Sequence, residues 1–318
     1  MTVPRPALDP ALSTKLADFP LGTDLNAELL AVMRQYNLPA DTHLAGRDVV
    51  RSEHSVAAAD GAELPVTVIR PAGATPVDAP CIYWLHGGGM VMGDRFANLD
   101  IPLEWLERFG AVVVTIDYRL APEVAGMTLV EDCYRGLVWL VAHAAELGID
   151  PTRLIVAGAS AGGGLAAGIV LMARDRNGPV IAAQVLICPM LDHRNITVSS
   201  RQYAGDPGVW TREKNLFGWQ SVLGETPATE VSSYVSPALA ADLSRLPTTY
   251  VDAGSAEVFR DEDVAYASGI WAAGGQAELH VWAGGFHGFD AMFPETPIAI
   301  AARSARTAWL ARLLTPNA

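Results

Sequence analysis

A serine flanked by glycines is the clearest sign of chemistry in this chain. Ser160 is the centre of Gly158-Ala159-Ser160-Ala161-Gly162, a G-x-S-x-G pentapeptide that follows the apolar run 154–157 and leads into an Ala- and Gly-rich stretch. Glycines on both sides of the serine permit a turn from strand to helix that is too sharp for larger side chains. Such a turn, a nucleophile elbow, exposes the hydroxyl at the N-terminus of a helix. We therefore predict that Ser160 is a nucleophile.

A serine hydroxyl attacks well only when a base removes its proton, and that base needs an acid to orient it. In folds with this pentapeptide, the acid and the histidine follow the serine, on loops after later strands. Four of the seven histidines precede Ser160, and His193 opens a long insertion. His280 falls inside an expected strand. This leaves His287, in the turn after that strand, as the general base.

The loop after the expected strand 248–252 supplies the candidates for the acid. Glu257 lies in the loop itself, where an orienting carboxylate would be. Asp252 at the strand end and Asp261 in the next helix remain alternatives, although carboxylates in a first helical turn also favour the helix dipole.

A run of three glycines follows another apolar strand, 81–85, in His86-Gly87-Gly88-Gly89. A Gly-rich loop can aim consecutive N–H groups at one point, which is what an oxyanion hole requires. No Lys-Ser or Lys-Thr signature follows the run, so we do not expect a phosphate-binding loop. The histidines show no paired ligand spacing, so we expect no metal site either.

The elements that must position these residues alternate between strand and helix. A hairpin is expected over 49–57 and 64–69, after helices within 8–44 that Thr23 or Asp24 would cap. Further strands are expected at 81–85, 111–116, 153–157, 184–187, 248–252 and 278–282, and helices at 99–109, 129–146, 160–174, 261–273 and 298–314. This alternation predicts an α/β fold with a mostly parallel central sheet flanked by helices.

Residues 192–238 interrupt the alternation and are too long for an ordinary connection. This insertion contains four aromatic residues, Tyr203, Trp210, Phe217 and Trp219. Two interpretations stay open: these side chains line a substrate pocket, or they form the small core of the insertion itself.

Composition limits the classes of partner. The 318 residues are 50% hydrophobic and 18% charged, enough apolar material for one large domain with insertions. The formal net charge of -13 argues against nucleic acid and anionic membranes as partners.

Three separated cysteines, Cys81, Cys133 and Cys188, favour buried free thiols over disulfides. With no evident signal peptide or membrane span, we expect a cytoplasmic protein.

Taken together, four motifs resemble the hormone-sensitive-lipase-like family of α/β-hydrolases, bacterial family IV, which contains many carboxylesterases. The resemblance covers residues 83–294. The motifs are His86-Gly87-Gly88-Gly89, Asp117-Tyr118-Arg119-Leu120-Ala121-Pro122-Glu123, Gly158-Ala159-Ser160-Ala161-Gly162-Gly163 and Phe286-His287-Gly288-Phe289.

The resemblance implies an α/β-hydrolase fold and a role for each matching residue. Ser160 would be the nucleophile and His287 the base and then the acid. The backbone N–H groups of Gly88, Gly89 and Ala161 would hold the oxyanion, with His86 bracing the glycine loop. The family usually has Asp-Pro-Leu-x-Asp in its acid loop, where this chain has Glu-Val-Phe-Arg-Asp over 257–261. This match favours Glu257 as the acid.

The resemblance also implies a helical cap over the site. The N-terminal helices, 1–44, would join the insertion at 192–238 to form it, and the catalytic domain would span 45–318.

The implied activity is hydrolysis of short- to medium-chain acyl esters, with a small-molecule ester as substrate and no cofactor. A specialised deacetylase, an amidase or a dehydratase would use the same machinery and remains an alternative. Ligand-binding receptors related to this family have lost the catalytic histidine, which is present here as His287. Pairing through the last strand and the final helix would give a homodimer, an alternative to a monomer.

Overall fold

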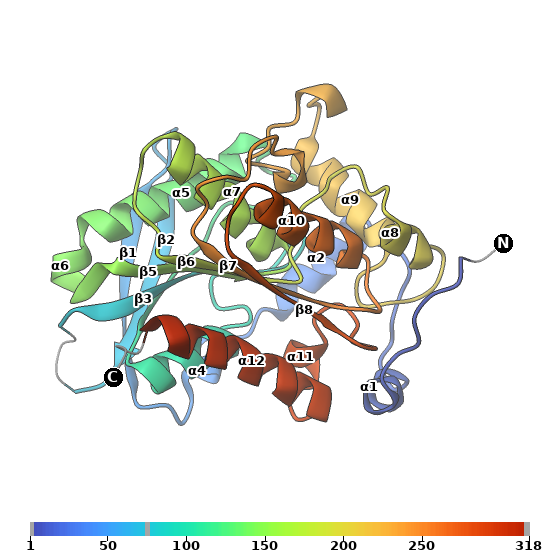
Figure 1. The fold of residues 1–318 in the computed structure, drawn as a ribbon, viewed down its shortest axis with the longest axis horizontal. Helices are drawn as coiled ribbons and strands as arrows, with labels where there is room; N and C mark the ends of the chain where they lie inside the picture. Colours follow the sequence, from blue (N-terminus) through green and yellow to red (C-terminus); the bar gives the residue numbers. More distant parts are fainter. Residues whose placement is uncertain (1–2, 74–76, 315–318) are drawn as a thin grey trace.

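An eight-stranded sheet forms the centre of the computed structural model, which describes residues 3–73 and 77–314 (Figure 1). The predicted domain limits at residues 1–2 and 315–318 thus lie outside the described residues. The strands are β1 (Val49–Ala57), β2 (Glu63–Pro71), β3 (Ala79–Leu85), β4 (Val112–Ile116), β5 (Ile149–Ala159), β6 (Ala183–Ile187), β7 (Thr248–Gly254) and β8 (Ala277–Trp282). They lie in the order β1-β2-β4-β3-β5-β6-β7-β8. β1 and β2 form an antiparallel hairpin and β2 pairs antiparallel with β4, but all later pairs are parallel. The predicted mostly parallel sheet is therefore confirmed.

Helices cover both faces of the sheet, as the central strands require because they are buried on both sides. The main helices are α4 (Asp100–Phe109), α5 (Met127–Ala142), α6 (Ala144–Leu147), α7 (Ala161–Asp175), α10 (Arg260–Ala272), α11 (Phe289–Met292) and α12 (Pro297–Leu314). Figure 1 shows α4 and α12 on one face, with α5, α7 and α10 on the other. Strand β3 serves both cores, because Tyr83 packs with the α5 and α7 side and Trp84 with the α4 and α12 side.

Two local expectations were wrong. The second N-terminal helix, α2 (Ala27–Met33), is capped by Asn26, whose side chain accepts a hydrogen bond from the N–H of Leu29 at 2.9 Å. The predicted caps, Thr23 and Asp24, lie outside the helix, because α2 begins only at Ala27, directly after Asn26. The single helix expected over 129–146 is interrupted at His143, which leaves the helical backbone range between α5 and α6.

The N-terminal segment and the insertion after β6 contact each other although they are far apart in the sequence. The N-terminal segment contains α1 (Pro10–Leu16), α2, η1 (Arg34–Tyr36) and α3 (Ala40–Leu44), and the insertion contains α8 (Val198–Gln202), α9 (Arg212–Leu223), η2 (Ala228–Glu230) and η3 (Pro237–Leu239). Gly208 N–H donates to the Gly22 carbonyl at 3.3 Å, and the Thr211 hydroxyl donates to the Thr23 carbonyl at 2.5 Å. These bonds join the two segments beside the carboxyl ends of the strands.

Candidate active site

The predicted turn from strand to helix is present at Ser160, between β5 and α7. Ser160 has φ 57° and ψ -122°, a backbone conformation that is costly for a residue with a Cβ atom. A Cβ added at Gly158 would lie 2.3 Å from the Gly162 carbonyl oxygen, and one at Gly162 would lie 2.0 Å from the Leu85 carbonyl oxygen. Glycine is therefore required on both sides of the serine.

Two further loops bring a histidine and a glutamate to this serine. The Ser160 hydroxyl lies 2.8 Å from Nε2 of His287, and Nδ1 of the same ring lies 2.6 Å from Oε2 of Glu257. His287 lies in the loop between β8 and α11, and Glu257 in the loop between β7 and α10. The second carboxylate oxygen of Glu257 accepts the N–H of Gly254 at 2.7 Å. The side chains of His287 and Glu257 are buried, and the set is consistent with a Ser-His-acid triad.

The two alternative acids have other partners. Asp252 accepts hydrogen bonds from Arg306 at 2.8 Å and Trp282 at 3.1 Å, on the α12 side of β7. Asp261 accepts from the N–H of Ser199 at 2.7 Å. Neither carboxylate is hydrogen-bonded to the imidazole of His287, so the geometry favours Glu257.

The glycine run after β3 lies against the serine. Gly88 and Gly89 have φ angles of 115° and 63°, in the range that favours glycine. The backbone N–H groups of both residues, and that of Ala161 at the start of α7, have no hydrogen-bond acceptor among the described residues. Donors without an acceptor around the nucleophile are what an oxyanion hole needs.

His86 and Tyr118 hold this loop from behind. Nδ1 of His86 lies 2.7 Å from the Gly87 carbonyl oxygen, and the Tyr118 ring stacks on the imidazole with centroids 4.3 Å apart. The Tyr118 hydroxyl donates to the His86 carbonyl at 2.8 Å. Burial lowers the pKa of His86, which favours the neutral imidazole. Tyr118 lies in one of the sequence motifs, but the sequence alone gave it no role.

Comparison with known proteins now identifies the family. Residues 82–291, more than half of the chain, match a family described as having the alpha/beta hydrolase fold. The chain belongs to this α/β-hydrolase family. This also confirms the predicted resemblance to its hormone-sensitive-lipase-like members.

Relatives of this α/β-hydrolase include two proteins of Mycobacterium tuberculosis. Esterase LipI of Mycobacterium tuberculosis is 32% identical over 87% of this chain and 86% of LipI. Carboxylesterase NlhH of the same organism is 31% identical over 98% of each chain. Among solved structures, a bacterial heroin esterase has a TM-score of 0.87 at 34% identity, covering 98% of this chain and 99% of its own. Esterase LipW of Mycobacterium marinum has the same TM-score at 32% identity, with 99% of each chain covered.

A cavity of about 260 Å³ opens at Ser160 in this α/β-hydrolase. Its lining includes the glycine loop, His287 and apolar side chains of the N-terminal segment, among them Leu25 and Met33. Trp210 lines this cavity and also a second one, of about 430 Å³, that reaches His287 from the side of α1 and includes Tyr203.

Two of the four predicted pocket aromatics lie elsewhere. Neither cavity, as the described residues line it, includes Phe217 or Trp219. Trp219 is 1% exposed and packs its ring near that of His193. Helix α9 directs these two side chains into the main hydrophobic core, which also contains Tyr83 and Leu165, and not into a separate core of the insertion.

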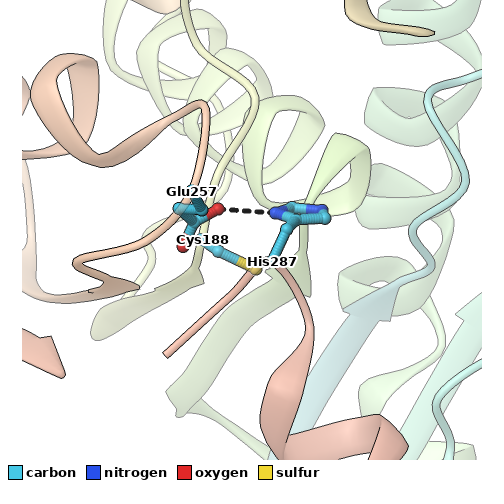
Figure 2. Close-up of side chains that lie close together, drawn as sticks. All are labelled: Cys188, Glu257 and His287. Carbon is cyan, nitrogen blue, oxygen red and sulfur yellow. Dashed lines mark hydrogen bonds and ion pairs between the residues drawn. The ribbon is translucent and has the colours of Figure 1, made fainter. Parts of the chain in front are cut away.

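A set of three possible metal ligands overlaps the triad of this α/β-hydrolase. The donor atoms of Cys188, Glu257 and His287 all lie within 4.8 Å of one another (Figure 2). Burial raises the pKa of the Cys188 thiol well above its usual range, which favours the neutral thiol, whereas a metal needs the thiolate. Spacing rules could not detect this set in the sequence, because its members lie after three different strands. Glu257 and His287 are hydrogen-bonded to each other here.

Proposed function

We propose that this α/β-hydrolase is a serine carboxylesterase for short- to medium-chain acyl esters, with Ser160, His287 and Glu257 as its catalytic triad. The observation that carries the proposal is the continuous hydrogen-bonded series from Ser160 through His287 to Glu257 at the edge of a small cavity. The family and the names of the relatives support the same activity, because several of those relatives are esterases.

The reaction follows from the geometry. The Ser160 oxygen attacks the ester carbonyl carbon while its proton passes to Nε2 of His287, and Glu257 stabilises the imidazolium that forms. Negative charge develops on the carbonyl oxygen, and the N–H groups of Gly88, Gly89 and Ala161 receive it. His287 then gives the proton to the leaving alcohol. Water, activated by the same imidazole, releases the acid from the acyl-enzyme, and no cofactor takes part in these steps.

The size of the cavity supports the preference for shorter acyl chains. About 260 Å³ is below the usual range for drug-sized ligands, so a long acyl chain would extend out of it. Its apolar lining, from residues such as Met92 and Ile101, favours an alkyl group over a strongly hydrated one. The proposed cap, made of residues 1–44 and 192–238, contributes one part of the cavity wall, through Leu25, Met33, Val209, Trp210 and Lys214.

The experiment that tests this function is hydrolysis of a p-nitrophenyl ester series from acetate to palmitate. We expect kcat/KM to be highest for acyl chains of about two to eight carbons and to fall for longer ones. Ser160→Ala should abolish hydrolysis, whereas Asp261→Asn, the matched control at an alternative acid, should retain it. A folded wild-type enzyme without activity on any of these esters would contradict the proposal.

Two further proposals concern location and assembly. We propose a cytoplasmic location, which three buried free thiols at Cys81, Cys133 and Cys188 support. No helix in the described part of the chain has the length and apolar character needed to cross a membrane.

We also propose a homodimer formed through β8, the last strand of the sheet, together with α12. Light scattering that gives the mass of one chain would contradict the dimer.

A further inference from the structure

An unusual cation lies beside the proposed ester site. The chain has only two lysines, Lys15 and Lys214. Lys15 forms an ion pair with Glu295 at 2.5 Å on the surface. Lys214 is half-buried and lines the cavity that contains Ser160, and no carboxylate of the described residues lies within ion-pair distance of its ammonium. Placing a cation there without a counter-charge is costly, so its presence calls for a function.

Two backbone carbonyls bind the Lys214 ammonium and leave one of its N–H donors unused. Lys214 lies in the first turn of α9, and its Nζ donates to the Gly208 carbonyl at 2.6 Å and to the Val209 carbonyl at 3.3 Å. An ammonium has three N–H donors, so one remains without an acceptor among the described residues. Burial lowers the pKa of Lys214, and the exposed Asp24 opposes this effect only from beyond ion-pair distance.

The carboxylate and the imidazole that also line the cavity each have a partner of opposite charge or a hydrogen-bond partner. The Asp290 carboxylate lines the same cavity, but it is 2% exposed and lies 2.5 Å from the Arg306 guanidinium. The His287 imidazole is hydrogen-bonded to Glu257. Among the described residues that line the cavity, Lys214 is therefore the one charged group without a partner of opposite charge.

We propose that the natural substrate is an ester that carries a carboxylate away from the scissile carbonyl, and that Lys214 binds this carboxylate. This inference rests on the proposed esterase function and names its substrate class. A hydrogen bond between an ammonium and a carboxylate is about twice as strong as a neutral one, and the apolar walls strengthen it further. Lys214 would thus determine specificity without touching the reacting atoms. The carboxylate can belong to the acyl part or to the alcohol part of the ester.

Two pairs of esters distinguish these sources. Mono-p-nitrophenyl adipate is compared with p-nitrophenyl hexanoate for the acyl side, and 4-acetoxybenzoate with its methyl ester for the alcohol side. Each pair is measured with wild type, Lys214→Met and the control Lys15→Met. We expect Lys214→Met to lower kcat/KM for the anionic ester of one pair by about tenfold or more, mainly through KM. Its neutral counterpart should change less than about twofold, and Lys15→Met should change neither.

Several outcomes would overturn the inference. Equal losses on the anionic and neutral esters would assign Lys214 a structural role, and unchanged activity on both anionic esters would show that it binds no carboxylate. Lys214→Arg should retain the preference for the anionic ester, because it keeps the charge. If Lys214→Met does not fold, Lys214→Gln, which removes the charge but keeps N–H donors, replaces it in the same assay. Failure of wild type on the neutral esters would instead reject the proposed function itself.

Discussion

At the scale of single residues, the role proposed for Glu257 predicts how its substitution changes kcat. Glu257 uses one oxygen for Gly254 N–H and the other for Nδ1 of His287. Glu257→Gln removes the charge that stabilises the imidazolium and should lower kcat by about 10² to 10⁴. Glu257→Asp shortens the arm by one methylene and should cost less. Steady-state kinetics on p-nitrophenyl butyrate would measure both, and a loss below tenfold for Glu257→Gln would exclude its role.

The triad residues differ in how far the sequence alone could predict them. Ser160 was predictable because the pentapeptide is local, and His287 because six other histidines could be eliminated. The acid needed the family resemblance, since Asp252 and Asp261 are near in sequence and only the fold separates them. Trp219 could not be assigned, because an aromatic side chain in an amphipathic stretch looks the same whether it faces a cavity or the core.

At the scale of elements, the glycine loop after β3 is supported by Tyr118, the second residue after β4. The Tyr118 hydroxyl is bonded to the His86 carbonyl, and its ring stacks on the imidazole behind the glycines. Tyr118→Phe keeps the stacking but removes the bond, so the free energy of unfolding should fall by about 1 to 2 kcal/mol. We also expect kcat to fall about tenfold with little change in KM, because the loop's donors act mainly in the transition state.

Urea unfolding and steady-state kinetics would test this role of Tyr118. Tyr36→Phe, at a residue that is 77% exposed, is the control and should change neither quantity. Unchanged kcat in Tyr118→Phe, together with the expected loss of stability, would show that the hydroxyl supports the fold but not the glycine loop.

The first turn of α10 should make stability depend on pH. Asp263 is fully buried, its carboxylate oxygens have no hydrogen-bond partner among the described residues, and burial followed by the charge of Glu257 raises its pKa well above the usual range. A carboxyl whose pKa is raised in the folded state keeps its proton there after the unfolded chain has lost it. The free energy of unfolding therefore falls as pH rises from the unfolded pKa, near 4, through the folded pKa.

Asp263→Asn removes this dependence because an amide does not ionise. Relative to wild type, the variant should gain stability as pH rises, by about 1 kcal/mol or more at pH 8, and show little difference near pH 4. Urea unfolding at several pH values measures the difference. The opposite trend, with a gain only at low pH, would show that the folded protein stabilises the ionised carboxylate.

Most elements were predictable because apolar runs of strand length and helical periodicity are strong local signals. The ends of these elements were harder to predict from the sequence. Strand β5 begins at Ile149 and not at Arg153, because Ile149 pairs with Ala79 of β3, and a pairing between distant residues has no local signal. The start of α2 was also expected too early, because Thr23, Asp24 and Asn26 are all good cap residues and only the structure shows that Asn26 directly precedes the helix.

At the scale of the whole molecule, the N-terminal segment connects the stability of the fold to the position of His287. Asp9 caps α1, and its backbone N–H donates to the carbonyl of Gly284, three residues before His287. Leu12 of α1 is fully buried in a cluster with Phe286 and Phe289, which lie on either side of His287 in the sequence. A helix that begins the chain thus packs against a loop near its end.

The packing of Leu12 predicts that its truncation lowers both the stability of the fold and kcat. Leu12→Ala would leave a cavity under the loop of His287, and we expect the free energy of unfolding to fall by about 2 to 5 kcal/mol. Because the loop then lacks its apolar support, kcat should also fall at temperatures where the variant is still folded. Leu38→Ala, at a leucine that is 55% exposed, should change neither. If Leu12→Ala lost stability but kept full kcat, the histidine loop would be held by β8 and α11 alone. The combined loss would instead show that α1 helps to position the triad.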